Sequence, residues 1–329
     1  MKIAFFSAKH YEREFFDLAC QVKGLDIVYF EEKLSQKTVA MTAGFAAVCV
    51  FVNDELDVTC IKHLVQKGVS LIALRCAGFN NVDLEAAKNC GIEVVRVPAY
   101  SPHAVAEHAM ALLLTLNRKT HKAYNRVREA NFSLDGLLGF DLYGKTVAVI
   151  GVGKIGRCMI TILKGFGCRV LAYDIVEDAD YAKQQGFAYV SLDEIYQQAD
   201  IISLHCPLTP KTKHLIDAAS IALMKKGVYL INTGRGALID SSALVSNLKA
   251  RQLGGVALDV YEQESEVFFE DHSQDIIEDD TLMRLITFPN VIITSHQGFF
   301  THEALSNIAE VTIKNIHDIF SKGVSENRL

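Results

Sequence analysis

Residues 145–174 read KTVAVIGVGKIGRCMITILKGFGCRVLAYD, and this stretch decides the fold. Its first part, Thr146 to Ile150, is a β-branched and apolar run that is typical of a buried parallel strand. A G-x-G-x-x-G sequence follows at once, then an apolar-periodic segment through Phe166, then a second strand from Arg169 to Tyr173. This order predicts a βαβ unit that carries a dinucleotide-binding fingerprint.

The residues of the glycine loop each have a physical reason to be there. Gly151 allows the tight turn, Gly153 lets the backbone approach a pyrophosphate, and Gly156 lets the helix pack closely on the strand. Lys154 and Ile155 lie between them, at the N-terminus of the predicted helix. The unpaired N–H groups and the positive dipole end of that terminus favour phosphate binding.

Asp174 ends the second strand, about twenty residues after the glycines. Its carboxylate can accept hydrogen bonds from a ribose that has a free 2′-hydroxyl, and it would repel a 2′-phosphate. The next residue is Ile175 rather than an arginine, so the sequence favours NAD over NADP. The alternative is that the glycines only form turns and that Asp174 is a solvated residue at a strand end.

The composition is that of a soluble globular enzyme. The 329 residues are enough for two domains, 22% of them are charged, and the net charge is −6 without a basic tail or stripe. Nucleic acid and membranes are therefore not expected as partners. The apolar run near the N-terminus is too short for a signal peptide, which predicts a cytoplasmic protein.

Eight cysteines occur without a C-x-x-C pair or zinc-like histidine spacing. Several of them lie within apolar runs, as Cys49 does. We therefore expect packed, reduced thiols, with neither disulfide bonds nor a metal site.

Strand-like and helical segments alternate along nearly the whole chain, which predicts an α/β protein with two doubly wound parallel sheets. Ser101 and Pro102 are typical of a helix start, and that helix is expected to run to about Asn117. Thr301 to Lys322 has the apolar spacing of an amphipathic helix. The other predicted strands are residues 2–6, 26–30, 47–52, 71–75 and 93–97 for the first sheet, and 188–190, 201–205, 228–232, 255–259 and 291–294 for the second.

Several motifs resemble the D-isomer-specific 2-hydroxyacid dehydrogenase family, essentially from end to end. They are RVPAYSPHAVAEHAMALLLTLNR, VIGVGKIG, SLHCPLTPKTKHLI, NTGRGALID, ALDVYEQE and NVIITSHQGF. RCAGFNNVDL and FSLDGLLGF are similar to the bacterial fermentative branch that acts on D-lactate. The resemblance implies a Rossmann NAD-binding domain (101–298) inserted into a flavodoxin-like catalytic domain (1–100 and 299–329), and a homo-oligomer.

The resemblance also implies a catalytic set. Arg235, in NTGRG, matches the arginine that grips the substrate carboxylate, which suits a planar guanidinium that can make two parallel hydrogen bonds. His296 matches the acid/base that supplies a proton to the alkoxide formed by hydride transfer. Glu264 matches its partner carboxylate, which would orient the ring and stabilise its charged form. The residues alone do not distinguish Glu264 from Glu262 or Glu266.

Further binding positions follow from the same motifs. Ala77 and Gly78 match a loop whose N–H groups contact the substrate carboxylate, while Tyr100 and Phe299 match aromatic walls or, alternatively, ordinary core residues. His205 is interpreted as structural. The coenzyme-contacting positions outside the glycine loop are Asp174, Cys206, Pro207, Thr212, Thr233, Gly234, Arg235 and Asp259.

The implied activity is the NADH-dependent reduction of pyruvate to D-lactate, with His296 as the proton donor. Two alternatives remain open from sequence. One is a D-2-hydroxyacid dehydrogenase for a larger 2-keto acid, and the other is a non-metabolic NAD-sensing scaffold of the same fold. A scaffold is expected to carry peptide-binding or disordered appendages, which this sequence does not indicate.

Overall fold

The computed structural model describes residues 2–264 and 267–329. The chain forms two compact units, one of Met1–Ser101 with Phe299–Leu329 and one of Pro102–Gly298.

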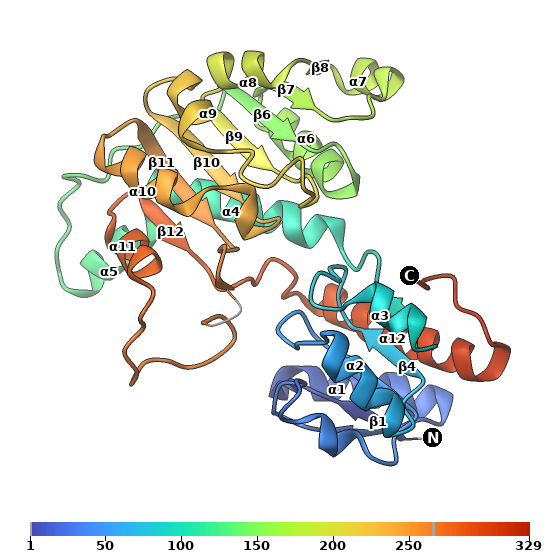
Figure 1. Ribbon diagram of the computed structural model, residues 1–329. Helices are drawn as coiled ribbons and strands as arrows, with labels where there is room; N and C mark the ends of the chain where they lie inside the picture. The colour runs from blue at the N-terminus through green and yellow to red at the C-terminus, as the bar shows by residue number, and fades with distance from the viewer. Residues whose placement is uncertain (1, 265–266) are drawn as a thin grey trace. The chain divides into compact units, whose positions relative to one another are not determined.

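The first unit is built on a five-stranded parallel sheet with the order β2-β1-β3-β4-β5 (Figure 1). This is the doubly wound order of flavodoxin-like folds, in which the order reverses next to the first strand. Helices α1 and α12 pack against each other, although they come from the two ends of the chain. The elements are β1 (Lys2–Phe5), α1 (His10–Lys23), β2 (Asp26–Tyr29), η1 (Val39–Thr42), β3 (Ala47–Val50), α2 (Val58–Gln66), β4 (Leu71–Leu74), α3 (Leu84–Asn89), β5 (Glu93–Arg96) and α12 (His302–Lys322).

The second unit has a seven-stranded parallel sheet with the order β12-β11-β10-β9-β6-β7-β8. The order reverses between β6 and β9, where a Rossmann fold binds its ligand. Its elements are α4 (Pro102–Arg118), α5 (Thr120–Arg128), β6 (Thr146–Ile150), α6 (Lys154–Gly165), β7 (Arg169–Tyr173), α7 (Ala179–Gln185), β8 (Ala188–Tyr189), α8 (Leu192–Gln198), β9 (Ile201–Leu204), α9 (Ala218–Leu223), β10 (Val228–Asn232), η2 (Gly236–Leu238), α10 (Ser241–Lys249), β11 (Leu253–Leu258), α11 (Asp280–Thr287) and β12 (Val291–Ile293).

Both faces of this second sheet are buried, which explains why its strands are continuous apolar runs. In β6, Val147 and Val149 belong to the core beneath α4 and α6. Ala148 and Ile150 point the other way, into the core beneath α8, α9, α10 and α11. Figure 1 shows these helices as separate layers on the two faces of the sheet.

The predicted fold class is confirmed, because the chain contains two parallel α/β sheets of the expected doubly wound kinds. The predicted strands are present, and most end one or two residues earlier than expected. The two long helices at Pro102 and His302 are also present, and the second is capped by the side chain of Thr301.

The helices and the cysteines of the chain can now be compared with the expectations from sequence. Among the helices of residues 2–264 and 267–329, none is long and apolar enough to cross a membrane. All eight cysteines are free thiols, and five of them are buried.

Candidate active site

The glycine loop between β6 and α6 has the geometry that its sequence predicts. Gly151 has a φ of 99°, and a Cβ there would lie 2.5 Å from the backbone nitrogen of Cys206. A Cβ on Gly156 would overlap the carbonyl oxygen of Gly151. Gly153 caps α6, and a Cβ there would meet nothing within 4 Å. Gly151 and Gly156 are therefore required by the fold, whereas Gly153 leaves open space at the N-terminus of α6.

Asp174 lies at the end of β7, beside this loop. One carboxylate oxygen accepts a hydrogen bond from the N–H of Val152 at 2.6 Å, and the other accepts from Val176 at 3.1 Å. The carboxylate is thus fixed by two backbone donors. Its remaining lone pairs are available to a ligand at the loop, since each oxygen can accept more than one hydrogen bond.

The segment after β9 lies on the other side of the point at which the strand order reverses. His205 donates its backbone N–H to Ile150, and its ring nitrogen Nε2 lies 2.8 Å from Ser203 Oγ. Farther along, the hydroxyl of Thr212 donates to the carbonyl of Pro207 at 2.6 Å. Cys206 and Pro207 therefore lie on a turn that is held from both ends.

These residues fit a dinucleotide on observations of the protein itself. Besides the open space at Gly153, the hydroxyl of Thr233 is buried and has no hydrogen-bond partner among the described residues. Because buried polar groups are nearly always satisfied, such an orphaned hydroxyl indicates a missing ligand atom or water. Thr233 directly follows β10, at the edge of the sheet where ligands bind in this fold.

Arg235 lies on a short loop after β10 that is braced by Asn232. The side chain of Asn232 is buried, donates to the carbonyl of Arg235 at 2.9 Å and accepts from the N–H of Gly234 at 3.0 Å. Gly236 is required next, because a Cβ there would overlap the backbone of Tyr261. One guanidinium nitrogen of Arg235 donates to Gly234, which leaves most of the donors of this group for a ligand.

His296 and Glu264 form a pair. The nitrogen Nδ1 of His296 lies 2.8 Å from Oε1 of Glu264, and the other oxygen of Glu264 accepts from the N–H of Tyr261 at 2.9 Å. Both side chains are largely buried but retain some exposure. Glu262 has different partners, namely Nε2 of His214 at 2.6 Å and the hydroxyl of Ser241 at 3.2 Å. The third acidic residue considered from sequence, Glu266, lies outside the described residues.

Asp259 organises the backbone around His296. Its carboxylate accepts hydrogen bonds from Thr294 Oγ1, from the N–H of Gln297 and from the N–H of Gly298, and it lies 3.1 Å from Nε2 of His108. Burial alone would raise the pKa of this carboxyl, but the hydrogen bonds from His108, Thr294 and Gln297 outweigh burial and lower it. Asp259 is therefore a buried, ionised group.

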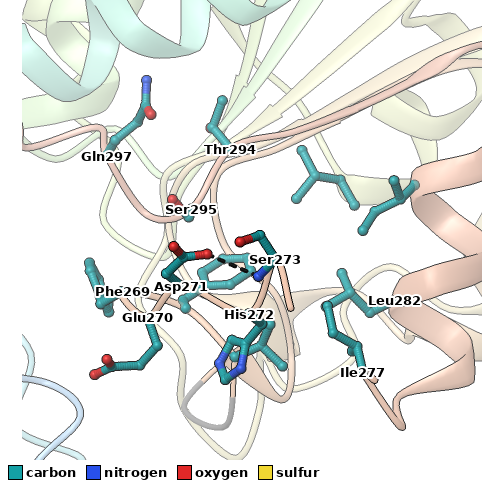
Figure 2. A pocket seen from close by; sticks show the side chains of 14 residues that line it. Phe269, Glu270, Asp271, His272, Ser273, Ile277, Leu282, Thr294, Ser295 and Gln297 are labelled. Atoms are coloured by element: carbon teal, nitrogen blue, oxygen red, sulfur yellow. Dashed lines mark hydrogen bonds between the residues drawn. The ribbon is translucent and has the colours of Figure 1, made fainter. Parts of the chain in front are cut away.

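A cavity of about 810 Å³ lies next to this loop. Figure 2 shows Thr294, Ser295 and Gln297 along its upper side, with Phe269, Asp271 and His272 below them in the view. The ring centroids of Phe269 and His296 are 5.8 Å apart, so the ring of Phe269 covers one side of the imidazole. Glu270 and Asp271 add two acidic side chains to the lining of this cavity.

The remaining predicted positions belong to the first unit. The carbonyls of Ala77 and Gly78 are held by the side chains of Arg96 and Cys76, respectively. The rings of Tyr100 and Phe299 are 6.4 Å apart in an edge-to-face arrangement.

The ring centroid of Phe51 lies 5.8 Å from that of Phe299. Phe51 was not among the positions predicted from sequence. Its place directly after β3 was the only sequence feature that could have drawn attention to it.

Within the second unit, the structure brings the chemistry-bearing residues to one edge. Arg235, Asp259 and His296 follow the carboxyl ends of β10, β11 and β12, which are adjacent in the sheet. Glu264 reaches the same edge through its contact with His296. Sequence reasoning missed His108 and Thr294, although both lie within quoted motifs. Among the described residues, no group of histidine, cysteine or acidic side chains could hold a metal ion.

Comparison with known proteins agrees with this geometry. The profile described as "D-isomer specific 2-hydroxyacid dehydrogenase, NAD binding domain" matches residues 110–298. The D-lactate dehydrogenase of Escherichia coli (strain K12) is 49% identical over 329 residues, which is 100% of both chains.

Solved structures of similar proteins cover nearly the whole chain. The apo-structure of D-lactate dehydrogenase from Escherichia coli superposes with a TM-score of 0.91 and 46% identity, and covers 100% of both chains. D-lactate dehydrogenase from Aquifex aeolicus, complexed with NAD and lactic acid, superposes with a TM-score of 0.86 and 35% identity, and covers 98% of this chain and 96% of that one.

The chain therefore belongs to the D-isomer-specific 2-hydroxyacid dehydrogenase family, and the Rossmann unit that carries the glycine loop is its NAD-binding domain. It is an NAD-dependent oxidoreductase of that family.

Proposed function

We propose that the protein is an NAD-dependent D-lactate dehydrogenase that reduces pyruvate to D-lactate with NADH. The observation that carries this proposal is the hydrogen bond between His296 Nδ1 and Glu264 Oε1, at the carboxyl edge of a sheet in an NAD-binding domain. The full-length similarity to D-lactate dehydrogenases supports the substrate.

The proposed roles follow from the chemistry of the side chains. NADH, when bound, supplies the hydride that reduces the keto carbon. Arg235 binds the substrate carboxylate through parallel N–H groups and fixes its plane. Since Nδ1 of His296 is held by Glu264, the nitrogen Nε2 delivers the proton to the developing alkoxide. Glu264 stabilises the imidazolium before that transfer.

The coenzyme would be held by the glycine loop and by the segments that surround it. Gly153 and the N-terminus of α6 would receive the pyrophosphate, and Asp174 would accept from the ribose diol. Cys206, Pro207, Thr212, Thr233, Gly234 and Asp259 would contribute the remaining contacts.

The other unit, residues 1–100 with 299–329, is proposed to be the catalytic domain. The backbone of Ala77 and Gly78 would bind the substrate carboxylate. Tyr100 and Phe299 would form aromatic walls that suit a methyl group better than a long side chain. A pocket for larger 2-keto acids is the alternative.

We also infer a homo-oligomer. None of the residues of α5 is buried, although its sequence is amphipathic, and Tyr124 is 62% exposed. The segment that follows exposes Phe132, Leu134, Leu138 and Tyr143, with Leu138 88% exposed. Several exposed apolar side chains within one segment of the chain favour a protein interface there. The free thiols are consistent with a cytoplasmic location, which remains a prediction.

The test is a panel of 2-keto acids of increasing side-chain size, with the loss of NADH absorbance as the readout. Pyruvate should give the highest kcat/KM, and NADPH should be a much poorer reductant than NADH. A branched or aromatic keto acid with a higher kcat/KM would favour the alternative. An absence of turnover with every keto acid would favour the scaffold.

A further inference from the structure

Three consecutive backbone N–H groups, those of residues 296–298, all donate hydrogen bonds to Asp259. The N–H of His296 donates to the carbonyl of Asp259 at 2.7 Å. The N–H groups of Gln297 and Gly298 donate to the two carboxylate oxygens of the same residue at 2.9 and 2.7 Å. His296 itself has a φ of 54°, in the left-handed region that side chains other than glycine adopt rarely. The position of the imidazole therefore depends on where the Asp259 carboxylate lies.

That carboxylate is in turn held by two side chains from other elements. Asp259 is 1% exposed, and Thr294, at the end of β12, reaches its Oδ1 at 2.5 Å. His108, on α4, places Nε2 at 3.1 Å from the same Oδ1 and at 3.1 Å from the hydroxyl oxygen of Thr294.

The protons of this cluster can be assigned by counting donors. An ionised carboxylate only accepts, and the hydroxyl of Thr294 has one proton, which the short contact directs to Asp259. The oxygen of Thr294 must therefore accept from His108. It follows that Nε2 of His108 carries a hydrogen and donates to both Thr294 and Asp259.

We propose that His108 is a positioning residue for proton transfer: through its Nε2–H it fixes Thr294 and Asp259, and thereby the backbone and imidazole of His296. This proposal rests on the proposed function and adds to it a residue of α4 that does not touch the reacting atoms. Without the donor, the carboxylate of Asp259 loses one of its side-chain anchors, and the His296 segment can shift. Misplacement of a reacting group by about 1 Å can lower a rate about a hundredfold.

The test compares His108→Leu with His108→Gln. The glutamine carries an N–H group that can reach toward the position of Nε2, whereas leucine fills similar space without a donor. We expect His108→Leu to lower kcat for keto acid reduction by about tenfold to a hundredfold. The KM for NADH should be nearly unchanged, and the solvent isotope effect on kcat should rise. His108→Gln should recover most of kcat.

Two further variants make the result specific. His103→Leu removes an exposed histidine from the same helix and should leave kcat unchanged. Thr294→Val removes the hydroxyl that links His108 to Asp259 while keeping the side-chain shape, and it should lower kcat in the same way. If His108→Leu does not fold, as judged by circular dichroism and Tm, Thr294→Val decides the question.

Equal kcat in the leucine and glutamine variants, or a change confined to KM, would overturn the role of His108 as a donor. A wild-type enzyme that reduces no 2-keto acid would remove the proposed function, and this proposal with it. The two failures are thus distinguished by the activity of the wild-type protein.

Discussion

Glu264 Oε1 lies 2.8 Å from Nδ1 of His296, whereas Glu262, two residues earlier, lies 2.6 Å from Nε2 of His214. The two glutamates of one short motif therefore serve different histidines. Only the Glu264 pair lies beside the loop after β12 that Asp259 holds. The pair formed by Glu262 instead links the loop after β9 to the start of α10, through Ser241.

Replacing Glu264 by glutamine should slow catalysis in both directions. The amide would keep a hydrogen-bonding side chain at this position but remove the carboxylate that pairs with Nδ1 of His296. Loss of one charged hydrogen bond should lower kcat for pyruvate reduction by about tenfold to a hundredfold, while the KM for NADH should change little. The measurement is kcat for pyruvate reduction and for D-lactate oxidation.

The matched control for that experiment is Glu262→Gln, which removes an equal charge from the neighbouring pair. Its kcat should be close to that of the wild-type enzyme. The assignment of Glu264 would be wrong if the control lowered kcat and Glu264→Gln did not.

Arg235→Lys should not be a conservative change. A lysine ammonium cannot reproduce the two parallel hydrogen bonds of a guanidinium. Loss of one charged hydrogen bond should lower kcat/KM for pyruvate by about tenfold to a hundredfold. The dissociation constant of NADH, measured by fluorescence titration, should change little. Near-normal kcat/KM in this variant would mean that the substrate carboxylate binds elsewhere.

Two alanine substitutions in the glycine loop should have separable effects. Gly153→Ala adds a methyl group where the protein has nothing within 4 Å, so Tm should be nearly unchanged while NADH binding weakens. Gly156→Ala forces a methyl group against the carbonyl of Gly151, which should destabilise the protein by about 1–3 kcal/mol and weaken binding as well. Normal NADH affinity in Gly153→Ala would argue against a pyrophosphate at this position.

His205 should make stability depend on pH. Burial lowers its pKa from the ordinary 6.5 to about 4. Between those values the unfolded chain binds a proton that the folded chain does not, so the free energy of unfolding should fall as pH falls through this window. His205→Gln should make that dependence shallower. Urea unfolding at several pH values measures it, and parallel curves for the two proteins would contradict the buried, neutral assignment.

Local patterns in the sequence were enough for the fold class and for the backbone geometry of the glycine loop. The strand Thr146–Ile150 is buried at every position because both of its faces are covered, and its apolar pattern is visible without a structure. The glycine loop is similarly local, since Gly151 and Gly156 contact each other across a single turn.

Contacts between distant residues were decided only by the tertiary structure. Glu262 and Glu264 are chemically alike and lie in one motif, so their partners depend on how the chain turns after β11 and on where β12 ends. His108 and Asp259 are 151 positions apart, and they meet because α4 packs against β11. Sequence patterns report the environment of neighbouring residues, whereas these hydrogen bonds depend on strand order and helix packing, which bring separate segments to one edge of the sheet.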